Sequence, residues 1–474
     1  MIQVSNFSGQ AFQADAKAVL LDVFNPATGK VIGQVPLASE GMALQAVDNA
    51  KQAQTPWAAL APIDRAKALQ SMALQIEQNA IEIAEVLALE TGKSADDALA
   101  EVGYSVEILR YHSEWARRLE GEIIPSDNAR EQLYLHREPM GVVVALIPFN
   151  FPIYTLLRKI APALIAGNTV VVRPSNTTPL SALVLAKAVL ASAMPSGAVN
   201  ILAMDHAVCE SMCRHTAVGM MSLTGSLTAG REILRYAQEN IAKTSLELGG
   251  KTPAIIAADA NLHKAAAEIV GSRLNHCGQV CTGVARVMVE RSVYRQFLQM
   301  VKHLMQQKTW GDRRVQPQHM GPLATAAARR HVQVMVDKAL TQGANLELGG
   351  FVPEGPGYFY PPTLLTDCRQ DMEIIQEEVF GPVMTIMPVD DMAQALAWAN
   401  DHQYGLASVI YTHRHDTVQM FAHGIEAGEL YVNRTPADPY QGYHAGWKRS
   451  GLGGDDGKHG MLEFTRTRLV VMPY

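Results

Sequence analysis

Along the first quarter of the chain, apolar residues recur three and four positions apart among Ala, Leu, Glu and Gln. This spacing predicts helices from "SEGMALQAVDNAKQAQTPWAAL", which begins at residue 39, to "RRLEGE", which ends at residue 122. The pattern then changes, because "EQLYLHREP" at residues 131–139 alternates between apolar and polar positions. An alternation of this kind predicts an exposed strand or hairpin.

Beyond residue 140, apolar runs typical of buried strands alternate with helix-like stretches. The strand-like runs are "GVVVALIPF" (141–149), "NTVVVRPS" (168–175), "VNILA" (199–203) and "VGMMSLTGS" (218–226). A second region of this type starts near residue 251 and runs to about residue 430. Apolar strands separated by helices indicate βαβ units and parallel sheets, so we expect two α/β lobes.

The tail "SGLGGDDGKHGMLEFTRTRLVVMPY" is rich in glycine and ends in a short apolar strand. An apolar final strand has no later partner in sequence, so we expect it to dock against another subunit or domain. No repeat or low-complexity segment is visible, which argues against solenoids and propellers. The expected architecture is therefore α/β, with two lobes and a projecting strand element.

Length, charge and cysteine content narrow the class of protein further. The 474 residues exceed what one hydrophobic core holds, so roughly three domain-sized units are expected. A net charge of −6 gives no basic field for nucleic acid, and no apolar run is long enough to span a membrane. No secretory signal is visible at the N-terminus, and five sparse cysteines favour a reducing compartment. We expect a cytoplasmic protein.

The stretch "SRLNHCGQVCTGVARV" at residues 272–287 contains two cysteines and allows several interpretations. A zinc site needs more ligands than His276, Cys277 and Cys281 supply, and the C-x-x-x-C spacing differs from the usual C-x-x-C of a redox pair. What remains is Cys281 as a nucleophile and Cys277 as a packed neighbour. No metal site is expected.

A second pair, Cys209 and Cys213 in "CESMCRH", invites the same comparison with a zinc site. If this stretch is helical, both thiols lie on one face, and buried neutral thiols are the expected outcome.

Three further positions could carry chemistry, each with an ordinary structural alternative. Gly225 and Gly230 stand between an apolar strand and a helix, which suits phosphate binding but also any strand-to-helix turn. Glu247 stands between leucines before a glycine pair, so it is either a general base or a strand-end residue in a salt bridge. Asn150 could donate to an oxyanion or simply make a turn.

Many short motifs in order resemble the aldehyde dehydrogenase superfamily over nearly the whole chain. They include "FNPATGKVIG", "PFNFP", "VVVRPSNTTP", "LTGSLTAG", "LELGGK", "GQVCTG", "EEVFGPV" and "YVNR". The resemblance implies an NAD(P)-dependent enzyme and usually a homodimer or homotetramer. It also implies a cofactor-binding domain (1–121 and 140–250), a catalytic domain (251–445) and an oligomerisation element (122–139 and 446–474).

The resemblance assigns roles to individual residues. Cys281 is similar to the family nucleophile, whose thiolate attacks the aldehyde carbonyl. Asn150 and the backbone N–H of Cys281 would hold the oxyanion, and Glu247 would activate the water that hydrolyses the thioester. The positions that resemble the family's cofactor site are Ile147, Pro148, Arg173, Ser175, Asn176, Gly225, Ser226, Leu248, Glu378 and Phe380.

The segments "GYHAGWKRSGLGGDDGKHGMLEF", "EWARRLEGEIIPSD" and "LLRKIAPALIAGN" are most similar to the lactaldehyde/glycolaldehyde dehydrogenase branch. By this resemblance, Arg158 and His444 would contact the polar end of a short 2-hydroxyaldehyde. Such a substrate needs hydrogen-bond donors, because an apolar pocket discriminates poorly for an added hydroxyl. The alternatives are a salt-bridged helix residue for Arg158 and a loop histidine at a subunit contact for His444.

The chain departs from the family pattern where "RPSN" replaces the frequent Lys-Pro-Ser-Glu. Asn176 removes a charge that would repel a 2′-phosphate, and Arg173 keeps a cation that can bind phosphate. We therefore expect NADP to be accepted at least as well as NAD. The segment "AMDHAVC" also lacks the glycines that are usual near the adenine.

Other functions are compatible with parts of the same pattern. Arg158 could pair with the carboxylate of a semialdehyde such as succinate semialdehyde. An acyl-CoA-forming enzyme is disfavoured because Glu247 supplies a hydrolytic base. A non-catalytic scaffold is disfavoured because the nucleophile, the base and the oxyanion donor are all present.

Overall fold

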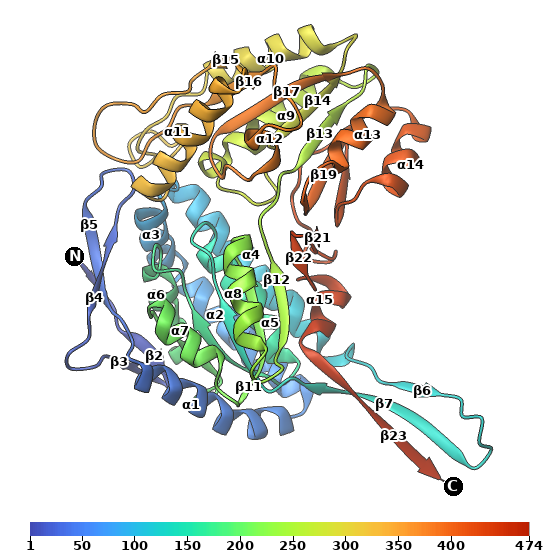
Figure 1. Cartoon of the computed structure of the whole chain (residues 1–474). Coiled ribbons are helices and arrows are strands. Elements are labelled where there is room, and N and C mark those ends of the chain that lie inside the picture. The colour runs from blue at the N-terminus through green and yellow to red at the C-terminus, as the bar shows by residue number, and fades with distance from the viewer. Residues whose placement is uncertain (474) are drawn as a thin grey trace.

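Two α/β lobes make up most of the molecule, and a narrow arm of strands projects from them, with the C-terminus at its end (Figure 1). The computed structural model describes residues 1–473. Both expected lobes are present, each built on a largely parallel sheet.

The first lobe contains an eight-stranded sheet whose five central strands are parallel. Three of them, β8, β9 and β11, are mostly apolar and buried, as expected where helices cover both faces of a parallel sheet. In spatial order the strands are β22 (Gly451–Leu452), β12 (Lys243–Glu247), β11 (Val218–Thr224), β8 (Val142–Leu146), β9 (Thr169–Arg173), β10 (Val199–Ile201), β2 (Asn6–Ser8) and β3 (Ala11–Gln13).

Helices cover both faces of this sheet and bury two separate apolar clusters against it. The prediction of helices at residues 39–122 is confirmed, since four long helices and a short 3-10 helix occupy this segment. The helices of this lobe are α1 (Glu40–Ala59), α2 (Pro62–Gln78), α3 (Ala80–Thr91), α4 (Ala95–Ser113), η1 (Glu114–Arg117), α5 (Pro152–Ile165), α6 (Leu180–Ala191), α7 (His206–Cys213) and α8 (Leu227–Ala237).

The second lobe has a seven-stranded sheet in which one edge strand, β15, is antiparallel. Its strands, in spatial order, are β15 (Asn345–Leu348), β16 (Thr363–Thr366), β17 (Val383–Val389), β14 (Arg286–Glu290), β13 (Pro253–Ile256), β19 (Ala407–Tyr411) and β20 (Glu429–Val432). Its helices are α9 (Leu262–Leu274), η2 (Asn275–Gly278), α10 (Tyr294–Gln306), α11 (Ala326–Thr341), α12 (Glu373–Gln376), α13 (Met392–Asn400) and α14 (His415–Gly424).

The projecting arm is a three-stranded antiparallel sheet of β23 (Thr465–Pro473), β7 (Glu131–Pro139) and β6 (Glu122–Ile124). The alternating stretch at residues 131–139 is thus a strand, as predicted. The final strand pairs along its whole length with β7 of the same chain and forms one edge of this sheet. Sequence order hides this pairing because the two strands are more than 300 residues apart.

Only the last part of the expected element 446–474 joins the arm. The residues before β23 lie with the lobes, because β21 (Trp447–Lys448) pairs with β18 (Tyr404–Gly405) and β22 pairs with β12. Helix α15 (Gly457–Glu463) follows β22 and leads into β23.

A small sheet of β1 (Ile2–Gln3), β5 (Val31–Pro36) and β4 (Leu20–Phe24) lies at the N-terminal side of the first lobe (Figure 1). Within residues 1–473, none of the helices has the length and apolar character needed to cross a bilayer.

Candidate active site

Cys277 and Cys281 occupy different environments although four positions separate them. His276 and Cys277 both adopt left-handed backbone conformations, with φ of 45° and 56°, which turns the chain sharply after α9. The Cys277 side chain is fully buried in the core of the second lobe, as predicted for a packed neighbour. Cys281 is partly accessible and lies on the wall of a cavity.

This cavity, of about 420 Å³, lies where the two lobes meet. It brings together nearly all the residues that resemble the family's cofactor site, together with the candidate nucleophile and oxyanion donor. Those on its wall are Ile147, Pro148, Asn150, Arg173, Ser175, Gly225, Ser226, Leu248, Cys281, Glu378 and Phe380. Asn176 is absent from this wall, and its buried side-chain oxygen has no hydrogen-bond partner in residues 1–473.

The turn between β11 and α8 presents a helix N-terminus to the cavity. Gly225 donates its backbone N–H to the carbonyl oxygen of Glu247 at 2.9 Å, and the Ser226 hydroxyl caps the helix by accepting from the N–H of Ala229 at 3.2 Å. The positive end of a helix dipole stabilises negative charge, so this turn suits the pyrophosphate of a dinucleotide.

Glu378 is held against the glycine pair that follows Glu247. Its Oε1 accepts from the N–H of Gly250 at 3.1 Å, and a Cβ on Gly249 would lie 2.2 Å from its Oε2. Burial raises the pKa of Glu378 to about 7, and the Gly250 hydrogen bond opposes that rise. A fixed carboxyl beside Phe380 on the cavity wall fits the hydroxyl donors of a ribose.

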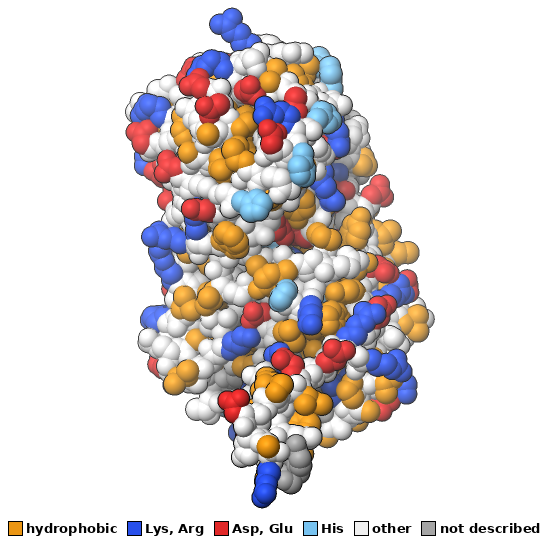
Figure 2. Space-filling model, turned by 90° about the vertical axis from the view of Figure 1, so that its right-hand side faces the viewer, with side chains coloured by type: hydrophobic (Ala, Val, Ile, Leu, Met, Phe, Trp, Pro, Cys, Tyr) orange, Lys and Arg blue, Asp and Glu red, His pale blue; other side chains and the backbone are white. Residues whose placement is uncertain are grey.

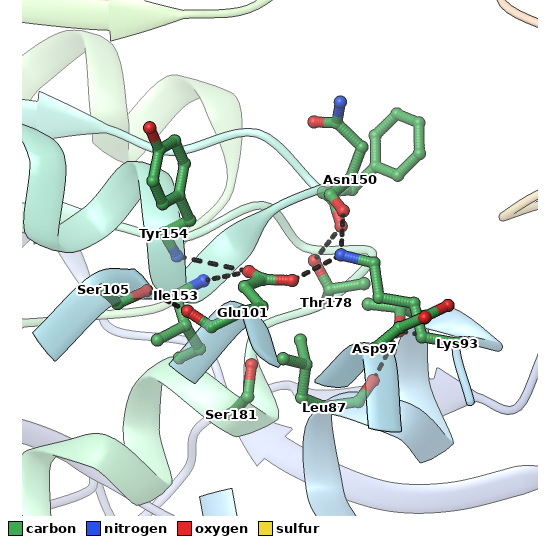
Figure 3. Close-up of polar contacts among 12 residues, drawn as sticks. Leu87, Lys93, Asp97, Glu101, Ser105, Asn150, Ile153, Tyr154, Thr178 and Ser181 are labelled. Carbon is green, nitrogen blue, oxygen red and sulfur yellow. Dashed lines mark hydrogen bonds and ion pairs between the residues drawn. The ribbon is translucent and has the colours of Figure 1, made fainter. Parts of the chain in front are cut away.

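Asn150 is fixed from both its side chain and its backbone, and Figure 3 shows the backbone contact with Lys93. Its Nδ2 donates to the carbonyl oxygen of Gln279 at 2.9 Å, and its own carbonyl oxygen accepts from Lys93 Nζ at 2.7 Å. A side-chain amide carries two N–H donors, so one remains for an oxyanion formed at Cys281.

Lys93 and Glu101 form the buried ion pair behind Asn150 (Figure 3). The ammonium also lies 3.8 Å from the centre of the Phe151 ring. Glu101 accepts in addition from the backbone N–H groups of Ile153 and Tyr154, at 3.0 and 3.2 Å, at the start of α5. We call Lys93, Glu101 and Asn150 the amide-side cluster.

Glu247 stands at the end of β12, with a side chain that is only 3% exposed. Neither carboxyl oxygen has a hydrogen-bond partner in the described part of the chain. Burial raises the pKa of Glu247 to about 8, and the charge of His444 opposes the rise. A carboxyl group whose pKa lies near neutrality is suited to general base catalysis.

His444 lies between Glu247 and two further carboxyl groups. Its Nε2 is 3.3 Å from Glu247 Oε2, and its Nδ1 is 2.8 Å from Glu429 Oε1 and 3.7 Å from Asp438 Oδ2. Burial alone would lower the pKa of His444, but Asp438, Glu247 and Glu429 raise it well above its usual value. For Cys281, burial raises the thiol pKa and a hydrogen bond with His444 lowers it.

Arg158, on α5, is already ion-paired in the structure. Its guanidinium contacts Asp456 and lies 3.6 Å from Asp438 and 3.9 Å from Asp455, while the neighbouring Lys159 lies 3.0 Å from Asp455. The alternative of a salt-bridged helix residue therefore describes its contacts. We use the name base-side cluster for the following residues: Arg158, Lys159, Glu247, Glu429, Asp438, His444, Asp455 and Asp456.

One group within residues 1–473 has the geometry to hold a metal ion, and it belongs to the base-side cluster. Ligand atoms of Glu429, Asp438 and His444 all lie within 4.8 Å of one another. A histidine must be deprotonated to bind a metal, so the raised pKa of His444 opposes binding.

Several residues around the site were missed by the sequence analysis. Lys93, Glu101, Glu429 and Asp438 reach the site only through tertiary contacts, and no local motif marks them. Cys209 is buried as predicted, yet it also reaches the cavity wall near Arg173. The sequence showed that the segment containing "GGDDG" is unusual for the family, but it did not predict the contact of its two aspartates with Arg158.

Comparison with known proteins identifies the family of this chain. The model of the aldehyde dehydrogenase family matches residues 12–470. The chain is 42% identical to lactaldehyde dehydrogenase of Escherichia coli (strain K12) over 95% of both chains. It is 37% identical to 3,6-anhydro-alpha-L-galactose dehydrogenase of Vibrio sp. (strain EJY3), again over 95% of both.

Solved structures show the same likeness. The crystal structure of lactaldehyde dehydrogenase from Escherichia coli superposes with a TM-score of 0.98 at 40% identity, over 99% of both chains. A 3,6-anhydro-L-galactose dehydrogenase solved in complex with NADP gives a TM-score of 0.96 at 36% identity, over 99% of this chain and 100% of that one. The chain therefore belongs to the aldehyde dehydrogenase family and is an oxidoreductase that acts on aldehydes.

Proposed function

We propose that the protein oxidises short 2-hydroxyaldehydes, such as lactaldehyde and glycolaldehyde, to their acids through a thioester on Cys281. The thiolate adds to the aldehyde carbon, and the oxygen becomes an oxyanion held by Asn150 and the backbone N–H of Cys281. The cavity residues Gly225, Ser226, Glu378 and Phe380 would hold NAD(P), which would supply a hydride acceptor for this carbon.

Hydrolysis of the thioester completes the cycle in this proposal. Glu247 takes a proton from water, the hydroxide oxygen bonds to the acyl carbon, and the C–S bond breaks to return the thiolate. The observation that carries the proposal is that Cys281 and Asn150 share one cavity wall with the N-terminus of α8. A nucleophile, an amide donor and an anion site thus surround one space.

The base-side cluster favours a small, uncharged, hydroxylated substrate. It contains more carboxyl groups than cations, because Glu247, Glu429 and three aspartates surround Arg158, Lys159 and His444. Hydroxyl groups can donate to carboxylates and accept from Arg158 or His444. The names of the two relatives above, which refer to lactaldehyde and to an anhydro sugar, support a polar aldehyde.

The same charges disfavour succinate semialdehyde. Its carboxylate would need the charge of Arg158, which three aspartates already balance. Like charges at short distance are unfavourable, so binding an anion here would require the substrate to displace an existing partner.

Kinetics with matched aldehydes test the proposed substrate. We expect kcat/KM for glycolaldehyde and lactaldehyde to exceed that for propanal and for succinate semialdehyde by at least about tenfold, or ~1.4 kcal/mol. Cys281→Ala should abolish oxidation while the cofactor still binds, as measured by quenching of protein fluorescence. A preference for succinate semialdehyde would overturn the substrate assignment.

We also propose that NADP is accepted at least as well as NAD. Arg173 lies on the cavity wall. Within residues 1–473 its guanidinium makes one hydrogen bond, to the carbonyl oxygen of Met204 at 3.3 Å, and its Nε has no partner. Its free donors can therefore bind a 2′-phosphate. A preference for NAD above about tenfold in kcat/KM, which corresponds to ~1.4 kcal/mol, would contradict this.

Finally, we propose that the arm joins two copies of the chain into a homodimer or homotetramer. β23 lies at an edge of its sheet and exposes Leu469, Val471 and Met472. Apolar side chains also gather along the lower half of the face from which the arm projects (Figure 2). An open, apolar strand edge favours pairing with another chain. Light scattering should give at least twice the chain mass, and Val471→Lys should reduce it.

A further inference from the structure

Glu247 has one ion-pair partner in the described part of the chain, and that partner is His444. The carboxyl group is almost completely buried, and neither of its oxygens accepts a hydrogen bond there. A buried carboxyl group without partners binds a proton, because burial disfavours its charged form. A protonated Glu247 could not take a proton from water, so the base depends on a nearby cation.

Carboxyl groups face both ring nitrogens of His444, and their negative charge favours the protonated ring. Glu429, on β20, faces Nδ1 at 2.8 Å, and Asp438, in the following loop, lies 3.7 Å from the same nitrogen. The hydroxyl of Tyr431 donates to both carboxylates, at 3.1 and 3.5 Å, and so orients them. The opposing cation is Arg158 of α5, whose charge Asp456 and its neighbours balance.

We propose that His444, held as an imidazolium by Glu429 and Asp438, is a positioning residue that favours the ionised form of Glu247 needed for hydrolysis of the thioester. This inference rests on the proposed function, since it requires a thioester at Cys281. It assigns His444 a role in releasing the acyl group, which is separate from any contact with the substrate hydroxyl.

The test uses an aldehyde that has no 2-hydroxyl group. With propanal, His444 has no substrate hydroxyl to contact, so an effect on deacylation acts either through Glu247 or through the departing Cys281 thiolate. Rapid mixing followed by acid quenching and protein mass measurement gives the lifetime of the acyl enzyme on Cys281. The pH profile of this lifetime separates the two routes, because weaker stabilisation of the thiolate slows deacylation at every pH, whereas a change at Glu247 moves the pH midpoint.

For His444→Gln we expect the pH midpoint of deacylation to move upward by about one unit or more. Deacylation at pH 7 should then slow about tenfold for each unit of the shift. His444→Ala should behave in the same way, and added imidazole should restore part of its rate. A merely structural role of the ring would give neither the shifted midpoint nor the rescue.

Two carboxamide variants test whether the carboxylate that faces Nδ1 of His444 is required. Glu429→Gln leaves the ring in place but removes its nearest carboxylate, so it should shift the midpoint in the same direction by a smaller amount. Glu426→Gln, three positions earlier, removes only a partly exposed ion pair with Lys448 and should leave deacylation unchanged. The Glu429 variant also provides the test if the His444 variants fail to fold.

An unchanged midpoint and lifetime in His444→Gln and Glu429→Gln, with a raised KM for glycolaldehyde alone, would overturn the inference. That result would leave His444 as a substrate contact only. If the wild-type protein formed no acyl adduct at all, the proposed function would fail first and the inference with it. The two failures are therefore distinguishable.

Discussion

The amide-side and base-side clusters are both buried and both contain ion pairs, yet they differ in charge balance. In the first, one cation, Lys93, meets one carboxylate, Glu101, and every strong acceptor has a donor. In the second, carboxyl groups outnumber cations, and burial raises the pKa of Glu247 to about 8 and of Asp456 to about 6.

The difference indicates that the two clusters serve different purposes. The hydrogen bonds of the balanced pair can fix the donor Asn150 in one place. A cluster with surplus carboxyl groups changes its charge near neutrality, which suits a base that must gain and lose a proton in each cycle. Changes to the two clusters should therefore affect different steps.

The largest effect is expected from Glu247→Gln in the base-side cluster. The burst of reduced cofactor should remain, because acylation does not need this carboxylate. Steady-state turnover should fall by about 10²–10⁴, the usual contribution of a general base. Stopped-flow absorbance measures both phases, and the loss of the burst itself would show that Glu247 acts before the thioester.

Lys93→Met should break the amide-side cluster instead. It leaves the buried Glu101 without its cation, which typically costs about 3–5 kcal/mol of folding stability. Misplacement of Asn150 should also slow acylation by up to about 100-fold, so the burst itself should weaken. Denaturant unfolding and stopped-flow kinetics check the two parts. An unaffected burst would show that Lys93 does not position the donor.

The pH dependence of deacylation should also separate the two clusters. Because the pKa of Glu247 is raised to about 8, the ionised base becomes more abundant as pH rises from 6 to 8. Deacylation should therefore increase by up to about tenfold per pH unit below that pKa and level off above it. The slope should disappear in Glu247→Gln and persist in Lys93→Met.

The smallest effect on activity is expected from Cys277→Ala, which touches neither cluster. The side chain is fully buried in the second lobe, so a loss of about 1 kcal/mol of stability is expected from the small cavity. Steady-state kinetics should match the wild type. An inactive variant with intact folding would reverse the assignment of the two cysteines.

Local patterns along the chain predicted much of the fold. Strands such as β8, β9 and β11 are continuous apolar runs bounded by turns, and such runs need no long-range information to be recognised. The pairing of β23 with β7 was not predictable, because strand partners are chosen by tertiary packing and register. The same applies to β22, which returns to the edge of β12.

The residues of the site likewise fall into those that local motifs predict and those that only tertiary contacts reveal. Asn150 and Cys281 stand in recognisable motifs, and the structure places both on one cavity wall. Lys93 contacts the backbone of a residue 57 positions away, and Glu429 contacts a histidine 15 positions away. Nothing in the neighbouring sequence distinguishes Lys93 and Glu429 from ordinary surface residues, since these two side chains acquire their partners only when the chain folds.

The hydrogen bond from Asn150 to the carbonyl oxygen of Gln279 joins a strand end of the first lobe to the nucleophile loop of the second. Catalytic activity thus depends on the interface between the two lobes, and neither lobe would catalyse the reaction if it were produced alone. Gentle warming that lets the halves separate should extinguish turnover while far-ultraviolet circular dichroism still reports intact helices.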